Sequence, residues 1–232
     1  MRTFYVRTLS VAALAALSFT PLVVAQGQAP APLSETQVQE LIARGQPADH
    51  ARLRAHFNEL AEQSAAEAKR HASMQQSFAG NTKLAHMATS MAAHCKRLMD
   101  LNQASAATLR ELATEHGTLA AGAVYEPPQG GTRPQVDRGV PSDKELADLA
   151  ANATSAADHR KLEQYFVALA NRYDRDAANH VAYAKSWRAT TKVPTAQTIA
   201  SHCDRLASQF REAEKEARAA AEMHKDMASR AK

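Results

Sequence analysis

The fold is decided by residues 48–79, which read ADHARLRAHFNELAEQSAAEAKRHASMQQSFA. Packing residues recur here at alternating steps of three and four, which is the a/d register of helices that pack lengthwise on partner helices. Pro47, just before the stretch, suits a first helical turn, where its missing N–H costs no hydrogen bond. We therefore expect one long helix over 48–79, with these residues on its packing face: His50, Leu53, Phe57, Leu60, Ser64, Glu67, His71, Met74 and Phe78.

The same pattern returns in the second half of the chain, where residues 157–188 read ADHRKLEQYFVALANRYDRDAANHVAYAKSWR. The expected packing face of this copy consists of His159, Leu162, Phe166, Leu169, Tyr173, Asp176, His180, Tyr183 and Trp187. Four histidines and one cysteine recur in the same order at offsets of 109 or 108 residues, which indicates an internal duplication with one deletion. The repeated set is His50, His71, His94, Cys95 and His116, followed by His159, His180, His202, Cys203 and His224.

Each copy predicts a helical hairpin, because a second stripe of the same kind follows a marked turn, Gly80-Asn81 in the first copy and 190–195 in the second. A short helix is expected before each hairpin, over 34–43 and 142–151, and no stretch predicts a strand. The fold class is therefore all-α, a tandem repeat of long antiparallel hairpins forming a four-helix bundle. The expected boundaries are a signal peptide at 1–25, a Pro/Ala tether at 26–33, hairpin repeats at 34–122 and 142–232, and a Pro/Gly-rich linker at 123–141.

The first 25 residues have the pattern of a secretory signal peptide. Arg2 and Arg7 supply the positive end, an apolar run covers 11–24, and small residues precede Gln26. We therefore expect a periplasmic or secreted protein with no membrane insertion after cleavage. Without Arg2 and Arg7 the net charge falls from +4 to about +2, which is too weak a bias to favour nucleic acid as a partner.

Residues at equal distances from a hairpin turn lie at the same height, and this rule sorts the histidines into two levels. His71 with His94, and His180 with His202, form a level near the turns. The outer level, near the chain ends, consists of His50, His116, His159 and His224. Along each helix the levels are separated by roughly 30 Å. Packing the two hairpins into one bundle would gather four histidines at each level.

Imidazole is a common ligand of transition metals, so these levels predict metal sites. The level near the turns is favoured because Glu67 and Asp176 each precede a histidine by four residues and share its helix face. A carboxylate there could ligate the ion or orient the imidazole. We expect a metal ion as the partner, with copper or zinc preferred, and no catalytic role. The candidate ligands are His71, His94, His180, His202, Glu67 and Asp176, with the outer level as a second site.

Two other interpretations of the histidines stay open. Buried His layers can fix the register of a long bundle without any ligand, as polar residues do at coiled-coil seams. Facing histidines could also hold a non-covalent haem, although there is no Cys-x-x-Cys-His motif for covalent attachment. Cys95 and Cys203 occupy equivalent places in the two copies, and an exported protein permits a disulfide between them. Thiolate ligation of a metal and free thiols are the alternatives for this pair.

The repeated string Ala-Asp-His-x-x-Leu…His…His-Cys-x-x-Leu, which includes 94–98 and 202–206, covers nearly the whole mature chain. It resembles that of a group of exported bacterial helical proteins with no established activity. The resemblance implies export and helical hairpins, and it implies no reaction. The chain also lacks a phosphate-binding glycine loop, a Gly-x-Ser-x-Gly elbow and a His-Glu-x-x-His motif, so a non-enzymatic role is expected.

Overall fold

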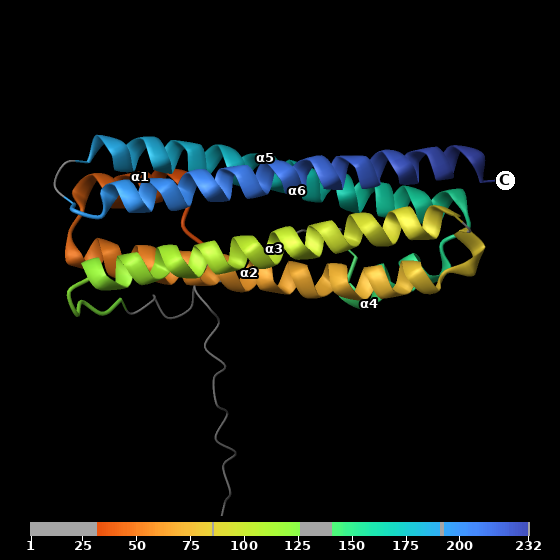
Figure 1. Ribbon diagram of the computed structural model, residues 1–232, viewed down its shortest axis with the longest axis horizontal. Helices are drawn as coiled ribbons and strands as arrows, with labels where there is room; N and C mark the ends of the chain where they lie inside the picture. Colours follow the sequence, from red (N-terminus) through yellow and green to blue (C-terminus); the bar gives the residue numbers. More distant parts are fainter. Residues whose placement is uncertain (1–31, 85, 126–140, 191–192, 232) are drawn as a thin grey trace, which may run out of the picture.

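The computed structural model describes residues 32–84, 86–125, 141–190 and 193–231, and all regular secondary structure in these ranges is helical (Figure 1). The all-α prediction is confirmed. The expected signal peptide, residues 26–31 of the tether and residues 126–140 of the linker lie outside the described residues. Within these ranges, no helix combines the length and apolar character that a bilayer crossing requires.

Four long helices make up most of the molecule. They are α2 (Pro47–Gly80), α3 (His86–Leu119), α5 (Ala156–Ala189) and α6 (Ala196–Arg230), each of 34 or 35 residues. At 1.5 Å per residue each is about 50 Å long. The 3-10 turn η1 (Thr82–Leu84) links α2 to α3. The helix predicted over 48–79 is confirmed, with one additional residue at each end.

Serine side chains determine where three of the helices begin. Ser155 accepts a hydrogen bond from the backbone N–H of Asp158, and the Asp158 carboxylate accepts one from the backbone N–H of Ser155. This reciprocal pair is a capping box. Equivalent boxes begin the two short helices, Ser34 with Gln37 at α1 (Glu35–Arg44) and Ser142 with Glu145 at α4 (Asp143–Asn152).

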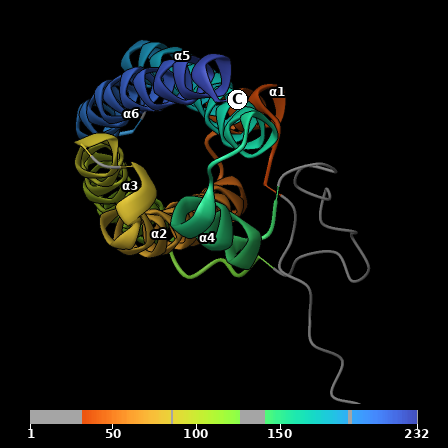
Figure 2. The ribbon, with the colours of Figure 1, turned by 90° about the vertical axis from the view of Figure 1, so that its right-hand side faces the viewer.

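The long helices form two antiparallel hairpins, α2 with α3 and α5 with α6, and α3 packs on α6 between them. The turns of the two hairpins lie at opposite ends of the molecule, so the hairpins run head to tail (Figure 1). The backbones of α2 and α5 approach each other less closely than those of α3 and α6. The short helices lie along this seam and each contacts both α2 and α5 (Figure 2).

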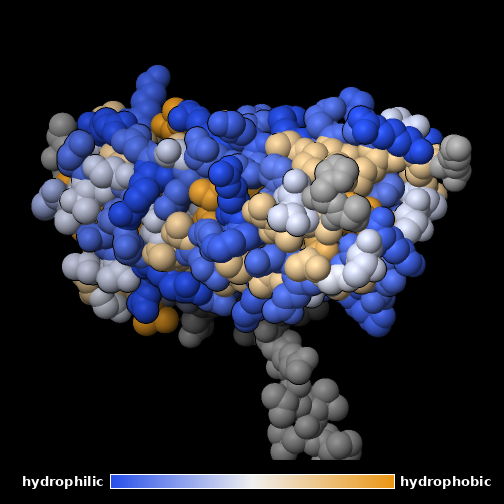
Figure 3. Space-filling model, turned by 45° about the vertical axis from the view of Figure 1, so that its right-hand side comes forward, coloured by the Kyte–Doolittle hydropathy of each residue, from blue (hydrophilic) through white to orange (hydrophobic). Residues whose placement is uncertain are grey.

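The packing face predicted for residues 48–79 and 157–188 is the buried face of α2 and α5. Every predicted seam position in α2 and α5 is buried except Leu60 and Asp176, which are partly exposed. Large rings such as Trp187 and Phe57 are fully enclosed, whereas α6 contributes mainly alanine to the core. The outer surface in the view of Figure 3 is largely hydrophilic. The unusual feature of this core is that it contains buried histidine rings, which come from all four long helices.

Candidate functional site

His50 on α2 and His116 on α3 form the first of two buried imidazole pairs. Their Nδ1 atoms lie 3.1 Å apart, and the ring centroids are 5.3 Å apart in a stacked arrangement. The relative exposures of His50 and His116 are 3% and 0%. The equal height predicted for these two residues is confirmed. At this separation, one Nδ1 carries a hydrogen and donates it to the other.

His159 on α5 and His224 on α6 form the second pair at the equivalent positions of the sequence repeat. Their Nδ1 atoms lie 3.3 Å apart, with ring centroids at 5.5 Å. Both residues are buried. The prediction of equal height is confirmed here as well. The two copies have thus kept one geometry although most residues between the histidines differ.

Aromatic rings from both hairpins enclose each pair. Trp187 of α5 lies 6.0 Å from His50 and 5.4 Å from His116, and Phe57 stacks on His116 at 5.3 Å. The second pair has the sequence-equivalent neighbours, since Phe78 and Phe166 lie 5.8 and 5.7 Å from His224. In each case the opposite hairpin supplies one ring. Each pair is thus completed only by the docking of the hairpins.

Burial keeps the paired imidazoles neutral. It lowers the pKa of His116 and of His224 to about 3, and it lowers the pKa of His50 and His159 as well. The Nε2 atoms of His116 and His224 are buried and have no hydrogen-bond partner. Because a buried unpaired N–H costs more than a buried lone pair, these rings carry their hydrogen on Nδ1 and donate it across the pair.

The two pairs lie at opposite ends of the molecule. His50 and His159 each sit in the first turn of a long helix, and the head-to-tail docking places those first turns far apart. Trp187, which covers the first pair, is 28 residues from His159 on the same helix, or about 40 Å. The expectation that four histidines share one outer level is wrong, because it assumed hairpins docked side by side in the same direction.

The level predicted near the turns does not form either. His71 stacks on Phe166, whereas His180 lies 6.3 Å from Phe57, and Phe57 is 14 residues from His71 along α2. The two histidines are therefore about 20 Å apart. Both are fully buried, which lowers the pKa of His71 to about 4 and that of His180 to about 3. His180 Nδ1 has no hydrogen-bond partner.

His94 and His202 point away from the core and bind carboxylates of the opposite hairpin. His94 Nδ1 donates to Glu216 Oε2 at 2.8 Å, and Arg97 donates to the same carboxylate at 2.5 Å. Burial alone would raise the pKa of Glu216, but these two contacts hold it below its ordinary value. In the second copy Glu111 accepts from Arg205 and lies 3.3 Å from His202 Nδ1. The His-x-x-Arg motif is thus a clamp between α3 and α6.

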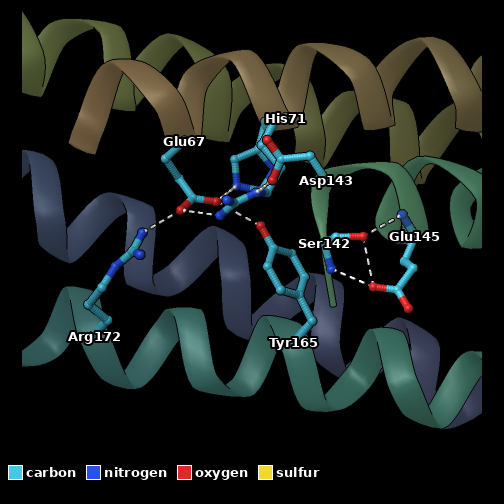
Figure 4. A network of polar contacts seen from close by, with 8 residues as sticks. Glu67, His71, Ser142, Asp143, Glu145, Tyr165 and Arg172 are labelled. Atoms are coloured by element: carbon cyan, nitrogen blue, oxygen red, sulfur yellow. Dashed lines mark hydrogen bonds and ion pairs between the residues drawn. The ribbon is translucent and has the colours of Figure 1, made fainter. Parts of the chain in front are cut away.

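Glu67 lies at the centre of a buried polar cluster between α2 and α5 (Figure 4). Its Oε1 accepts from the Tyr165 hydroxyl at 2.7 Å, and its Oε2 accepts from Arg172 and Arg70 at 2.8 and 2.9 Å. His71 Nε2 is 3.5 Å from Oε1. Burial favours the neutral acid, yet Arg172, His71 and Arg70 together hold the pKa of Glu67 at about 2. Of the predicted ligands, only Glu67 and His71 come together.

Asp176, the sequence equivalent of Glu67, has a different environment. Within the described part of the chain, no hydrogen bond or ion pair is formed by its carboxylate. Burial raises the pKa of Asp176 to about 6, an effect that Arg172 and Arg175 on the same helix partly offset. The two acidic residues therefore have different roles. Glu67 lies in an ion cluster, whereas the Asp176 carboxylate lines a cavity.

Cys95 and Cys203 are both free, and neither is exposed to solvent. His94, adjacent to Cys95, contacts Glu216, which lies 13 residues from Cys203 on α6, about 20 Å along the helix. A disulfide needs Cα atoms within about 7 Å, so the predicted bond between the repeats does not form. Burial raises the pKa of both thiols to about 12, which disfavours the thiolate that binds metals.

Sequence reasoning missed four residues that shape these sites, namely Tyr165, Arg172, Glu111 and Glu216. The signal for the first two was their position at or beside an a/d stripe, where a tyrosine and an arginine need partners when buried. Glu111 and Glu216 gave no comparable signal, because a glutamate on a polar helix face is usually solvated. Their partners lie in the opposite hairpin and follow from the docking alone.

In the part of the chain that the structure describes, no three His, Cys, Asp or Glu side chains converge in a way that could hold one metal ion. Comparisons with known proteins add no further information on function. No family model matches the chain, no curated protein matches it, and no solved structure matches it.

Proposed function

We propose that this protein is an exported, non-enzymatic metal-binding protein that holds a transition-metal ion, copper or zinc, at each of its two imidazole pairs. We further infer that its long helices form one four-helix bundle, created by duplication of a hairpin with its short leading helix. The sites of this proposal are His50 with His116 and His159 with His224. They replace the level near the turns that was favoured from the sequence.

The separation of the paired nitrogens carries the proposal. A tetrahedral metal ion with bonds of about 2.0 Å to imidazole has ligand atoms about 3.3 Å apart. The Nδ1 separations are 3.1 and 3.3 Å. Neutral imidazole is the form that ligates metals, and burial keeps all four rings neutral near pH 7. Binding would move one hydrogen per pair, that of His116 or His224, from Nδ1 to Nε2, since His50 and His159 already present an Nδ1 lone pair.

Two protein ligands leave two positions of a tetrahedral ion to small molecules such as water. Because each pair is buried between aromatic rings, filling these positions requires the rings to move aside. The same separations disfavour the haem alternative. Two axial nitrogens on one iron lie about 4 Å apart, twice a metal–nitrogen bond of about 2.0 Å. The pairs would have to open, and their aromatic neighbours would have to leave, to admit a porphyrin.

The test is the number of ions bound per chain. Equilibrium dialysis of the metal-free protein against Zn²⁺, and against Cu⁺ under reducing conditions, should give about two ions per chain. His116→Phe and His224→Phe should each remove one ion, and the double variant should bind none. His202→Asn, a change outside the pairs, is the matched control and should keep both ions. Binding that survives in the double variant, or no binding to the unaltered chain, contradicts the proposal.

A second candidate function follows from the hydrogen bonds and ring stacking within each pair. A buried imidazole pair between aromatic rings can serve as a polar layer that permits only one hairpin register. The protein would then be a structural or interaction module, without the disulfide expected from the sequence. In that case the metal-free protein binds no ions. Replacing one histidine of a pair then weakens the fold by about 1–3 kcal/mol, because the partner nitrogen loses its hydrogen bond.

A further inference from the structure

A cavity of about 250 Å³ lies among α2, α3, α5 and α6, beside the segment that leads into α1. It would hold roughly eight water molecules at about 30 Å³ each. Leu60 and Asp176 line it, and they are the only predicted seam positions of α2 and α5 that are not fully buried. The cavity therefore interrupts the packing face at a defined place. Its wall also includes Gln63, Asn179, His180, Tyr183 and Phe210.

The sequence repeat shows what fills the equivalent place in the other half of the molecule. Asp176 corresponds to Glu67, which accepts hydrogen bonds from Arg70 and Arg172. The residues at the positions corresponding to these two arginines are Asn179 and Gln63, which carry no charge. One half thus neutralises its carboxylate with guanidinium groups of its own chain. The other half has a carboxylate, an open space and neutral amides.

Among the described residues, no cation hydrogen-bonds to Asp176 in place of the missing guanidinium groups. Arg172 lines the cavity too, but its guanidinium is bound to Glu67 at 2.8 Å. Arg175, on the same helix as Asp176, is exposed. A negative group that faces a partly open cavity without a hydrogen-bonded partner favours a positively charged occupant.

His180 adds an independent indication that the cavity takes a ligand. It is 2% exposed, it lines the cavity, and its Nδ1 has no hydrogen-bond partner. The Nδ1 atom is enclosed by protein, whereas Nε2 is not and has no hydrogen-bond partner among the described residues, so Nε2 is the nitrogen that a ligand in the cavity can reach. The neighbouring rings Tyr183 and Phe210 lie 5.5 and 5.6 Å from His180 and form an aromatic wall. Aromatic faces attract cations.

We propose that this cavity binds a small organic cation, an amine or guanidinium compound with a compact apolar body. Its charged group pairs with Asp176, as the arginines pair with Glu67 in the other half. A second N–H of the ligand hydrogen-bonds to His180 Nε2, and the apolar body packs against Tyr183 and Phe210. The cavity is separate from the imidazole pairs, so this site does not depend on the proposed metal function.

The test uses benzylamine and phenylguanidine as probes, with benzyl alcohol and benzoate as neutral and negative counterparts. Calorimetric titration of the chelator-treated protein should show one benzylamine or phenylguanidine per chain, with no binding of the other two. Asp176→Asn should weaken binding at least tenfold. Asp148→Asn, which removes an exposed carboxylate of α4, should leave it unchanged. Equal binding of benzyl alcohol, or full affinity in Asp176→Asn, overturns the proposal.

A second variant tests the comparison of the two halves directly. Asn179→Arg places an arginine at the position corresponding to Arg70, where it can reach Asp176 from within the chain. This variant should abolish benzylamine binding and raise the melting temperature, since it supplies the missing cation. Binding that persists in a folded Asn179→Arg protein contradicts the assignment even if Asp176→Asn does not fold.

Discussion

Glu67 and Arg172 are 105 residues apart in the chain, yet Arg172 Nη2 donates to Glu67 Oε2 at 2.8 Å. The pair joins α2 to α5, the two long helices whose backbones lie farther apart than those of α3 and α6. Hydrogen bonds between ions are roughly twice as strong as neutral ones, and the Glu67 side chain is only 3% exposed. This contact therefore holds the two hairpins together along the side that the short helices cover.

The first prediction concerns the loss of that charge. Glu67→Gln should lower the free energy of unfolding by about 2–3 kcal/mol, because Arg172 loses its counter-ion and Arg70 keeps only Asp143. The figure is at the low end for a broken buried pair because both arginines keep some solvent contact. Urea unfolding followed by circular dichroism measures it. Asp100→Asn, which breaks an exposed pair with Lys96, is the control and should cost at most about 0.5 kcal/mol.

The second prediction concerns acid. His71 and His180 titrate near pH 4 and 3 in the folded protein, against 6.5 when unfolded. Because the unfolded chain binds more protons in this window, stability is complete above pH 6.5 and falls as the pH is lowered toward 4. Each histidine contributes a slope of about 1.4 kcal/mol per pH unit. Urea unfolding with a chelator, at several pH values, should show this loss.

His180→Phe removes one titrating group and should reduce that slope by about 1.4 kcal/mol per pH unit, the contribution of one proton. The matched control is Phe57→Leu, a neighbour that does not titrate, which should lower stability equally at every pH. A wild-type stability that stays constant between pH 6.5 and 4.5 would show that these imidazoles are not held neutral. Glu67 gives a separate, more acidic transition. Its pKa of about 2 in the fold means that its contribution is lost only as the pH falls below 4.5.

The third prediction uses the single tryptophan. Trp187 lies 6.0 Å from His50, whereas the second imidazole pair is about 40 Å away. Cu²⁺ bound at the first pair should therefore quench its fluorescence, and Cu²⁺ at the second pair should not. His116→Phe should abolish the quenching while His224→Phe leaves it intact. Equal quenching in both variants would place the copper somewhere other than the two pairs.

The fourth prediction concerns the thiols. Cys95 and Cys203 are buried with pKa values of about 12, so neither offers an accessible thiolate near neutral pH. The native protein should react with a thiol reagent only as fast as it unfolds. The denatured protein should react at once, with two equivalents of thiol per chain. A native protein that shows fewer than two thiols after denaturation would contain the disulfide that this fold excludes.

Much of the fold could be predicted from the sequence because helix and hairpin formation depend on local pattern. The stripe that starts at His50 defines α2, and counting from the turn places His50 beside His116 correctly. The same count fails for His71 and His94. Counting from the turn gives the height of a residue along the helix but not the direction in which its side chain points. On α3 the side chain that points into the core is that of Cys95, not that of His94. Adjacent residues of a helix point about 100° apart.

The docking of the hairpins could not be predicted from the same pattern. An a/d stripe reads the same in either direction, so it does not tell whether two hairpins pack in parallel or head to tail. The direction depends on specific contacts such as Glu67 with Tyr165 and His94 with Glu216, which pair residues about 100 positions apart. Every candidate site that needed residues from both hairpins at one level was therefore misplaced. Within one hairpin, the equal height of His50 with His116 and of His159 with His224 was predicted correctly.

The head-to-tail docking also bears on how such a molecule could have arisen. In each half, the ring that closes the imidazole pair comes from the other half, Trp187 over His50 and Phe78 over His224. A single hairpin would leave its own pair uncovered. Two identical hairpins related by a twofold axis across the helices would cover both, since such an interface uses the same patch twice. A hairpin of this kind would therefore need a second hairpin, in the same chain or in another, to cover its imidazole pair.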